Sequence, residues 1–218
     1  MAGRLVIALL TAAVLTGTAA AAAGKPEKRA ITPADQAWAK RINLSVRDVP
    51  TDFVQGPQQR SGASSLTCAS FAPDLSAFTI TGQASSHSFS RPDGTSLFSS
   101  AEVFRTNADE RGDWQRSARR AALPCLARTL ERLSRNGVQL RVTSSALRPA
   151  PRLGERSISF RIAATISANG SAVKTWFDID AVARGRADAT LAVISFWAPP
   201  ESALEHSLLA KLAGRLAK

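Results

Sequence analysis

The chain of 218 residues is poor in the side chains that most enzyme active sites use. It contains no Tyr, one Met, two His and two Cys. The sequence patterns of zinc proteases, serine hydrolases, P-loop nucleotide-binding proteins and dinucleotide-binding folds do not occur in it. The two histidines, His87 and His206, lie far apart along the chain. These absences remove the recognisable classes of nucleophilic and metal-dependent enzyme, and they favour a binding protein.

Long apolar runs are also missing, except near the N-terminus. Residues 1–23 have the pattern of a secretory signal peptide, with Arg4 in a positive first part, an apolar stretch from Leu5 to Leu15, and small residues up to Ala23. The alternative is a retained membrane anchor, for which the apolar stretch is short. No later segment has the length and apolar character to span a bilayer. We therefore expect a secreted or envelope-associated protein that is not transmembrane after cleavage.

Export would determine the expected oxidation state of the two cysteines. Residues 24–31 are polar and basic and are expected to be a linker, and 32–218 are expected to form a single domain. Exported domains fold in oxidising compartments, where a pair of cysteines forms a disulfide bond by default. We expect a Cys68–Cys125 bond, with two buried thiols as the alternative. Metal binding has less support, because neither cysteine has a histidine nearby in sequence.

One hairpin can be registered from the sequence. Asn169-Gly170 favours a two-residue turn in which both central residues have positive φ. Pairing outward from this turn places mostly apolar residues opposite one another on one face. The expected pairs are Ile166 with Val173, Ala164 with Thr175, Ile162 with Phe177, Phe160 with Ile179, and Ile158 with Ala181. The other face is expected to pair Thr165 with Lys174, Arg161 with Asp178, and Ser159 with Asp180. A shift of one residue would exchange the two faces, so the register is well specified.

The remaining elements follow from hydrophobic periodicity and turn residues. Helices are expected at about 32–44, 107–135 and 201–217, with N-caps at Thr32 and Asn107 and with Pro124 breaking or kinking the second helix. Strands are expected at 77–90, 97–106 and 138–147 and in the meander of 155–199, and 55–65 is expected to be a loop. The order is α-β-β-α-β-β-β-β-α. It predicts an α+β fold, a mostly antiparallel β-sheet flanked by helices.

Several of these features together resemble a known group. They are a helix running into Asp48-Val49-Pro50, two strands, the segment SSAEVFRTNADERGDW from Ser99 to Trp114, Cys125-Leu126 on a long helix, a meander and a final helix. This layout resembles secreted actinobacterial proteins with a PsbP-like fold, which include LpqN-type lipoproteins, and it is similar to the extracellular sensor domains of PknH-type kinases. The resemblance implies a helix-flanked antiparallel sheet and no established chemistry. No catalytic residue, metal or cofactor carries over.

Two groups of polar residues are candidate sites of catalysis or metal binding. Asp178 and Asp180 share a strand face, as a carboxylate pair for metal or acid–base work would, but Arg161 is expected opposite Asp178. We therefore favour a cross-strand ion pair. Ser86 and Ser88 flank His87, yet neighbouring strand residues face opposite ways. An enzyme of unrecognised type remains the alternative to a binding protein.

The charge of the chain is uneven. The formal net charge is +11, and residues 105–156 hold twelve Arg against five acids. Six of these arginines are expected to line the outer side of the second helix: Arg116, Arg119, Arg120, Arg128, Arg132 and Arg135. Such a surface could dock on an anionic envelope polymer, a lipid surface or an acidic protein. The alternative is a solvated helix face in an Arg-rich composition. Export and the lack of interleaved aromatic residues disfavour nucleic acid.

Overall fold

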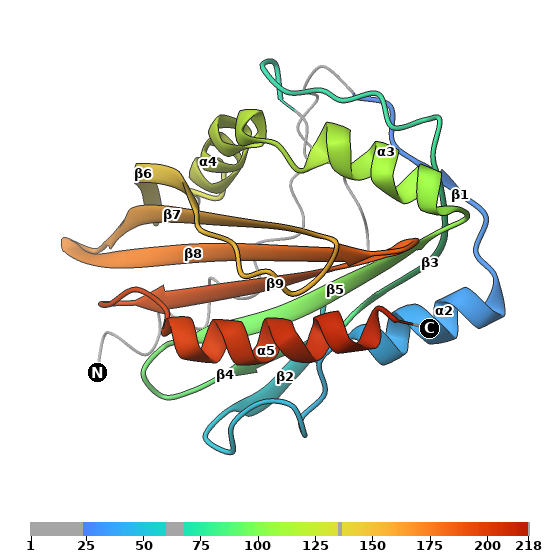
Figure 1. The fold of residues 1–218 in the computed structure, drawn as a ribbon. Coiled ribbons are helices and arrows are strands. Elements are labelled where there is room, and N and C mark those ends of the chain that lie inside the picture. The colour runs from blue at the N-terminus through green and yellow to red at the C-terminus, as the bar shows by residue number, and fades with distance from the viewer. Residues whose placement is uncertain (1–23, 60–67, 135–136, 218) are drawn as a thin grey trace.

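A computed structural model describes residues 24–59, 68–134 and 137–217 of the protein, and they form three layers (Figure 1). A nine-stranded, mostly antiparallel sheet lies in the middle, and helices cover both of its faces. The fold class predicted from the sequence is therefore confirmed. Residues 1–23, the expected signal peptide, lie outside the described residues.

The strands run through most of the described chain. They are β1 (Lys28–Arg29), β2 (Val54–Gln58), β3 (Thr79–Ser85), β4 (His87–Ser90), β5 (Ser96–Phe104), β6 (Gln139–Arg148), β7 (Arg156–Ala168), β8 (Ser171–Arg184) and β9 (Ala187–Phe196). Their order is β1-β3-β5-β9-β8-β7-β6, and β4 pairs with both β5 and β2. The β1–β3 pair is parallel, and the other strand pairs are antiparallel.

The helices form two layers. They are α2 (Pro33–Ile42), α3 (Asn107–Ser117), the 3-10 helix η1 (Arg120–Ala122), α4 (Leu123–Glu131) and α5 (Ser202–Arg215). Figure 1 shows α2 and α5 against one face of the sheet and α3 and α4 over the other. In the described part of the chain, no helix combines the length and the apolar character needed to cross a membrane.

The β7–β8 hairpin has the register that the sequence predicted. The cross-strand partners include Ile162 with Phe177 and Arg161 with Asp178, and they continue from Asn169-Gly170 to the far end of both strands. Asn169 and Gly170 have φ of 51° and 77°, as the turn requires. The sequence left the register of the following strand open. The structure settles it with a two-residue turn that pairs Arg184 with Ala187 and places β9 in the centre of the sheet.

The largest core lies between the sheet and the α2–α5 layer. Trp38 and Ile42 of α2 and Leu208 and Leu212 of α5 are buried there, against a group of apolar side chains on β5 and β9. A second core lies under α4 on the opposite face. It consists of Leu140, Ile162, Ala164, Ile166, Phe177 and Phe196, with Leu126 and Leu130 of α4 packed on them. The strands β7 and β8 contribute the apolar face of their hairpin to this second core.

The long helix expected over 107–135 is two helices. The chain leaves α3 at Ala118, turns through η1 and enters α4, where Pro124 lies in the first turn. A proline in the first turn of a helix loses no hydrogen bond, so Pro124 begins a helix and does not kink one. The N-cap of α3 is Thr106, whose hydroxyl accepts a hydrogen bond from the Asp109 N–H at 3.0 Å, and not Asn107. Thr32 caps α2 as expected.

Two strands appear where loops were expected. Lys28–Arg29 lie in the expected linker and pair with β3, and Val54–Gln58 pair with β4. Both are edge strands with exposed side chains, so they have no hydrophobic alternation that a sequence pattern could reveal.

The predicted disulfide bond is present. Cys68 and Cys125 are bonded, with their Cα atoms 5.7 Å apart. Both are buried, and together with Phe71 and Ala122 they form a small core of their own. The bond ties the chain before β3 to the helical layer of α3 and α4.

The packing of α2 on β3 depends on a glycine. A Cβ atom on Gly82 would lie 2.3 Å from the carbonyl oxygen of Asp35 in α2, which is closer than any real contact. Gly214 in α5 is the opposite case, because a Cβ there would meet nothing within 4 Å.

This contrast gives a matched pair of variants. We expect Gly82→Ala to lower the free energy of unfolding by about 1–3 kcal/mol, because helix and strand must separate. Gly214→Ala should raise it by up to about 1 kcal/mol, because glycine is a poor helix former. Urea denaturation of the oxidised protein measures both. Equal stability of the two variants would contradict the described fit of α2 on β3.

Candidate functional site

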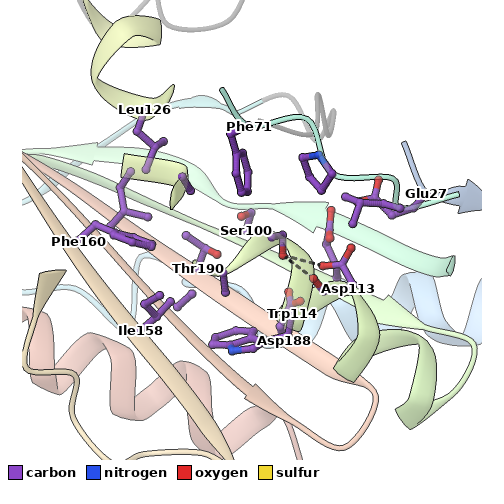
Figure 2. A pocket seen from close by; sticks show the side chains of 18 residues that line it. Glu27, Phe71, Ser100, Asp113, Trp114, Leu126, Ile158, Phe160, Asp188 and Thr190 are labelled. Atoms are coloured by element: carbon purple, nitrogen blue, oxygen red, sulfur yellow. Dashed lines mark hydrogen bonds between the residues drawn. The ribbon is translucent and has the colours of Figure 1, made fainter. Parts of the chain in front are cut away.

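A cavity of about 290 Å³ lies between the sheet and the layer of α3, η1 and α4. Its floor comes from β5, β7, β8 and β9, and its walls come from the helices and the segment 71–75. Figure 2 shows Leu126 and Phe160 toward one end of it and Glu27 and Asp113 toward the other. The cavity therefore has an apolar part and an acidic part.

The apolar part is built by alternate residues of the β7–β8 hairpin. Ile158 and Phe160 on β7 and Ile179 on β8 face the cavity, and Phe71 and Leu126 cover them from the opposite side. These hairpin positions belong to the face that the sequence predicted to be apolar. Part of that face is covered by α4, and the part beyond it remains open as the cavity floor.

The acidic part arises where β5 meets β9. Ser100 and Glu102 of β5 are the cross-strand partners of Thr190 and Asp188 of β9, and all four side chains line the cavity. Two carboxylates thus lie directly opposite each other on neighbouring strands. Such like-charged pairs are destabilising when both groups are ionised.

A third carboxylate reaches the same place from α3. Asp113 is only 6% exposed and lines the cavity. One of its oxygens accepts a hydrogen bond from the Ser117 hydroxyl at 3.1 Å, and the other, Oδ1, accepts none from the described donors, while the Glu27 carboxyl lies within reach of the Asp113 carboxyl. The amide of Gln83 donates to Glu102 at 2.5 Å.

Burial and mutual repulsion raise the pKa values of all three carboxyls. Burial is the main cause, and it raises the pKa of Glu102 to about 7 and that of Asp113 to about 8, with the charge of Glu27 adding to both. The pKa of Asp188 is raised well above its ordinary value by burial and by the neighbouring carboxylates. Near neutral pH these three carboxyls are therefore not all ionised.

The predicted basic residues lie on the outer side of the same helical layer. Five of them are exposed and belong to α3, η1, α4 or the residues between and directly after these helices: Arg116, Arg119, Arg120, Arg128 and Arg132. We call these five the basic surface. Arg135 lies outside the described residues.

The basic surface differs from the arginines elsewhere in the fold. Among the described residues, none of its five arginines forms an ion pair with a carboxylate, although Arg116 lies over the Phe78 ring at 4.9 Å and donates to the Asp74 carbonyl. Seven other arginines pair with acids: Arg91, Arg105, Arg148, Arg156, Arg161, Arg186 and Arg215. Exposed arginines for which the described residues show no ion pair also lie elsewhere, among them Arg41, Arg47 and Arg184. The basic surface is distinguished by five such residues that gather on one helical layer.

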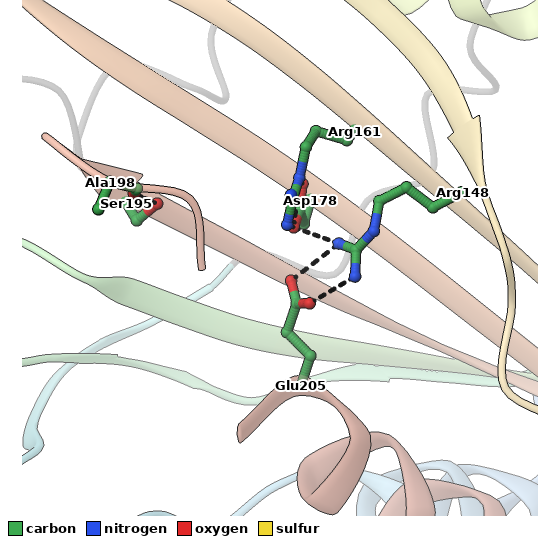
Figure 3. Close-up of polar contacts among 6 residues, drawn as sticks. All are labelled: Arg148, Arg161, Asp178, Ser195, Ala198 and Glu205. Carbon is green, nitrogen blue, oxygen red and sulfur yellow. Dashed lines mark hydrogen bonds and ion pairs between the residues drawn. The ribbon is translucent and has the colours of Figure 1, made fainter. Parts of the chain in front are cut away.

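The Arg161–Asp178 pair expected from the sequence is confirmed, and it is part of a larger network (Figure 3). Arg161 Nε lies 2.8 Å from a carboxylate oxygen of Asp178, which is completely buried. Arg148 of β6 also bonds Asp178, and it binds Glu205 of α5 with contacts of 2.8 and 3.2 Å. Asp178 therefore accepts two arginines and holds a structural position on the α5 face.

The histidines lie apart from the cavity. On β4, His87 Nδ1 is 2.9 Å from the carbonyl oxygen of Gly56 in β2, and His206 is exposed on α5. Neither histidine nor Asp178 lines the cavity. Within the described ranges, no three His, Cys, Asp or Glu residues are grouped so that they could hold a metal ion.

Sequence reasoning missed the acidic part of the cavity. Glu102 and Asp188 are 86 residues apart, and only the β5–β9 pairing brings them together. The one available signal was a charged residue in each of two otherwise apolar or small-residue strands.

The cavity carboxyls predict how stability depends on pH. In the unfolded chain Glu102 and Asp113 titrate near pH 4, and in the folded protein their pKa values are about 7 and about 8, so the folded protein holds more protons between these values. The raised pKa of Asp188 acts in the same direction. The free energy of unfolding should therefore fall as the pH rises from about 5 to 8.

Urea denaturation between pH 5 and pH 9 measures this decline. Asp188→Asn should make it shallower, whereas Asp52→Asn, which removes an exposed carboxylate, should leave its slope unchanged. Parallel curves for the Asp188 variant and the parent would contradict the raised pKa.

The Arg148 network predicts a second effect on stability. Arg148→Met should lower the free energy of unfolding by about 2–4 kcal/mol, because Glu205 and Asp178 each lose a buried charged partner. Arg152→Met, in the exposed loop that follows β6, should change it by less than about 0.5 kcal/mol. Thermal or urea unfolding distinguishes the two, and equal losses would argue against the network.

Comparisons with known proteins give one match to a solved structure. No protein-family model and no curated protein sequence matches the chain. The fold is similar to the extracellular domain of PknH from Mycobacterium tuberculosis, with 9% sequence identity and a TM-score of 0.47 over 86% of this chain and 98% of that one. The similarity in layout expected for PknH-type sensor domains is found at this level, and the relation to PsbP-like and LpqN-type proteins stays a prediction.

Proposed function

We propose that this protein is an exported binding domain whose basic surface docks on a polyanionic polymer of the cell envelope. The observation that carries the proposal is the gathering of five exposed arginines on one helical layer. Seven arginines pair with carboxylates within the fold, whereas the five of the basic surface face outward without a carboxylate partner among the described residues.

Export is supported by the disulfide bond and by the expected signal peptide. Disulfide bonds such as Cys68–Cys125 persist in oxidising compartments outside the cytoplasm. Polymers that carry phosphate or carboxylate groups are the abundant fixed anions of such a setting. Arginine suits them, because its planar guanidinium donates two parallel hydrogen bonds to either group.

A hydrated polymer fits the basic surface better than a lipid bilayer does. Proteins that lie on membranes insert apolar side chains beside their basic ones. The large apolar side chains that are exposed on the described residues lie elsewhere: Ile31, Val46, Val54, Leu147 and Trp197. Among the described residues, the layer of α3, η1 and α4 exposes the five arginines but no large apolar side chain that could insert into a bilayer.

The test is binding to inorganic polyphosphate as a soluble polyanion. Binding should weaken steeply with salt, because exposed charges are screened over about 10 Å at 0.1 M. The triple variant Arg120→Gln, Arg128→Gln and Arg132→Gln should bind roughly a hundredfold more weakly, at about 1 kcal/mol for each arginine near an anionic surface. Arg116 is left in place because it packs on Phe78.

A control with the same loss of charge separates a surface from a net charge. The variant Arg41→Gln, Arg47→Gln and Arg184→Gln changes exposed arginines outside the α3–α4 layer. It should keep most of the affinity. Equal weakening in both triple variants would reduce the effect to net charge, and stronger binding to phosphatidylglycerol vesicles than to polyphosphate would replace the polymer by a lipid surface.

A further inference from the structure

We propose that the cavity under α3 and α4 is a second binding site, which takes an organic cation with an apolar body, such as a primary alkylammonium compound. Glu102, Asp113 and Asp188 would receive the charged group, and the apolar walls around Phe160 and Leu126 would receive the body. This site is independent of the basic surface, because its residues face inward and carry the opposite charge.

The first argument is the unfavourable proximity of three carboxylates in the cavity. Glu102 and Asp188 are directly opposite each other on neighbouring strands, with Asp113 above them. The charges that act most strongly on Asp188 are all carboxylates, namely Glu102, Asp113, Glu110 and Glu27. Such a cluster costs stability and is retained where function uses it. A bound cation would convert the mutual repulsion into attraction to a shared partner.

The second argument is an unused hydrogen-bond acceptor. Asp113 is more than nine-tenths buried, lines the cavity, and has one oxygen that accepts no hydrogen bond from the described donors. Buried polar atoms are normally satisfied by protein, water or ligand. An ammonium group has three N–H donors and no acceptor, so it can bond Asp113 and a neighbouring carboxylate at the same time.

The third argument concerns the kind of cation. The described carboxylates do not converge as metal ligands do, and more than half of the lining is apolar. A volume of about 290 Å³ is at the lower end of the range for small-molecule sites. The indole of Trp114 also lines the cavity, and tryptophan is the aromatic side chain that attracts cations most strongly. These features select an organic cation over a metal ion.

Charges from the surrounding elements modulate the site and do not fill it. Glu27, which precedes β1, adds negative charge, and Arg29 on β1 attracts Glu102. On α3, Glu110 is paired with Arg156 of β7. Since the cavity carboxyls bind protons that a cation would displace, affinity should rise between pH 6 and pH 8.

The experiment is calorimetric titration of the oxidised protein with hexylammonium at pH 8 and low salt. Hexanoate has the same apolar body with a negative group, and Mg²⁺ has charge without a body. We expect hexylammonium to bind, hexanoate and Mg²⁺ to bind at least tenfold more weakly, and affinity to grow by about fourfold for each methylene from ethylammonium to hexylammonium.

The variants test the acidic part directly. Asp113→Asn and Asp188→Asn should each weaken hexylammonium binding at least tenfold while raising the melting temperature at pH 8, because each removes a repelled charge. Asp52→Asn, with the same change of net charge, should leave binding unchanged. The opposite movement of affinity and stability distinguishes a lost binding group from a damaged fold.

Three outcomes would overturn the proposal. Equal binding of hexanoate and hexylammonium would make the cavity a purely apolar site, and tighter binding of Mg²⁺ would make it a metal site. Unchanged affinity in both Asp variants would place the cation elsewhere. The Arg120, Arg128 and Arg132 triple variant should retain hexylammonium binding, so failure of the polymer proposal and failure of this one are distinguishable.

Discussion

Ion pairs between arginines and buried carboxylates hold the helices of this protein on its sheet. In the described part of the chain, three of the four α-helices are attached to a strand or a strand turn in this way: Arg186 binds Asp35 of α2, Arg156 binds Glu110 of α3, and Arg148 binds Glu205 of α5. Each pair fixes a helix at one point with directional contacts, which apolar packing alone does not provide. Because removing one member leaves the other charge buried, the pairs restrict how the layers can shift. The high arginine content is thus partly structural.

The sequence specified the elements whose information is local. The β7–β8 hairpin was predicted residue by residue, because its turn residues and the alternation of both strands agree. A break of the expected helix 107–135 at Pro124 was predicted, because proline disfavours a helix interior, but the end of α3 at Ala118 was not, because helical periodicity continues through that residue. Strands β1 and β2 were missed because edge strands with polar side chains are formed by their partners and not by their own patterns.

The functional features also differ in whether local sequence information or contacts between distant segments determine them. The basic surface and the disulfide bond could be anticipated, since a charge excess and a single cysteine pair are properties of composition. The cavity could not be anticipated. It exists where the β7–β8 hairpin extends beyond α4 and where β5 pairs with β9, and both facts depend on contacts between distant segments. The apolar face of the hairpin is covered by α4 only in part, and the uncovered part forms the floor of the cavity.

The disulfide bond has a consequence for this cavity. Phe71 and Ala122 are packed on the bonded cysteines and also form part of the cavity wall. The wall is therefore closed covalently, by a loop of chain that joins the segment before β3 to the helices above the sheet. Oxidation of the thiols and occupation of the cavity then favour the same closed arrangement of the wall. By thermodynamic linkage, any compound that binds only the closed form makes the bond harder to reduce, and reduction loosens that compound's hold. Reduction of the disulfide bond and binding of such a compound in the cavity would then be thermodynamically coupled.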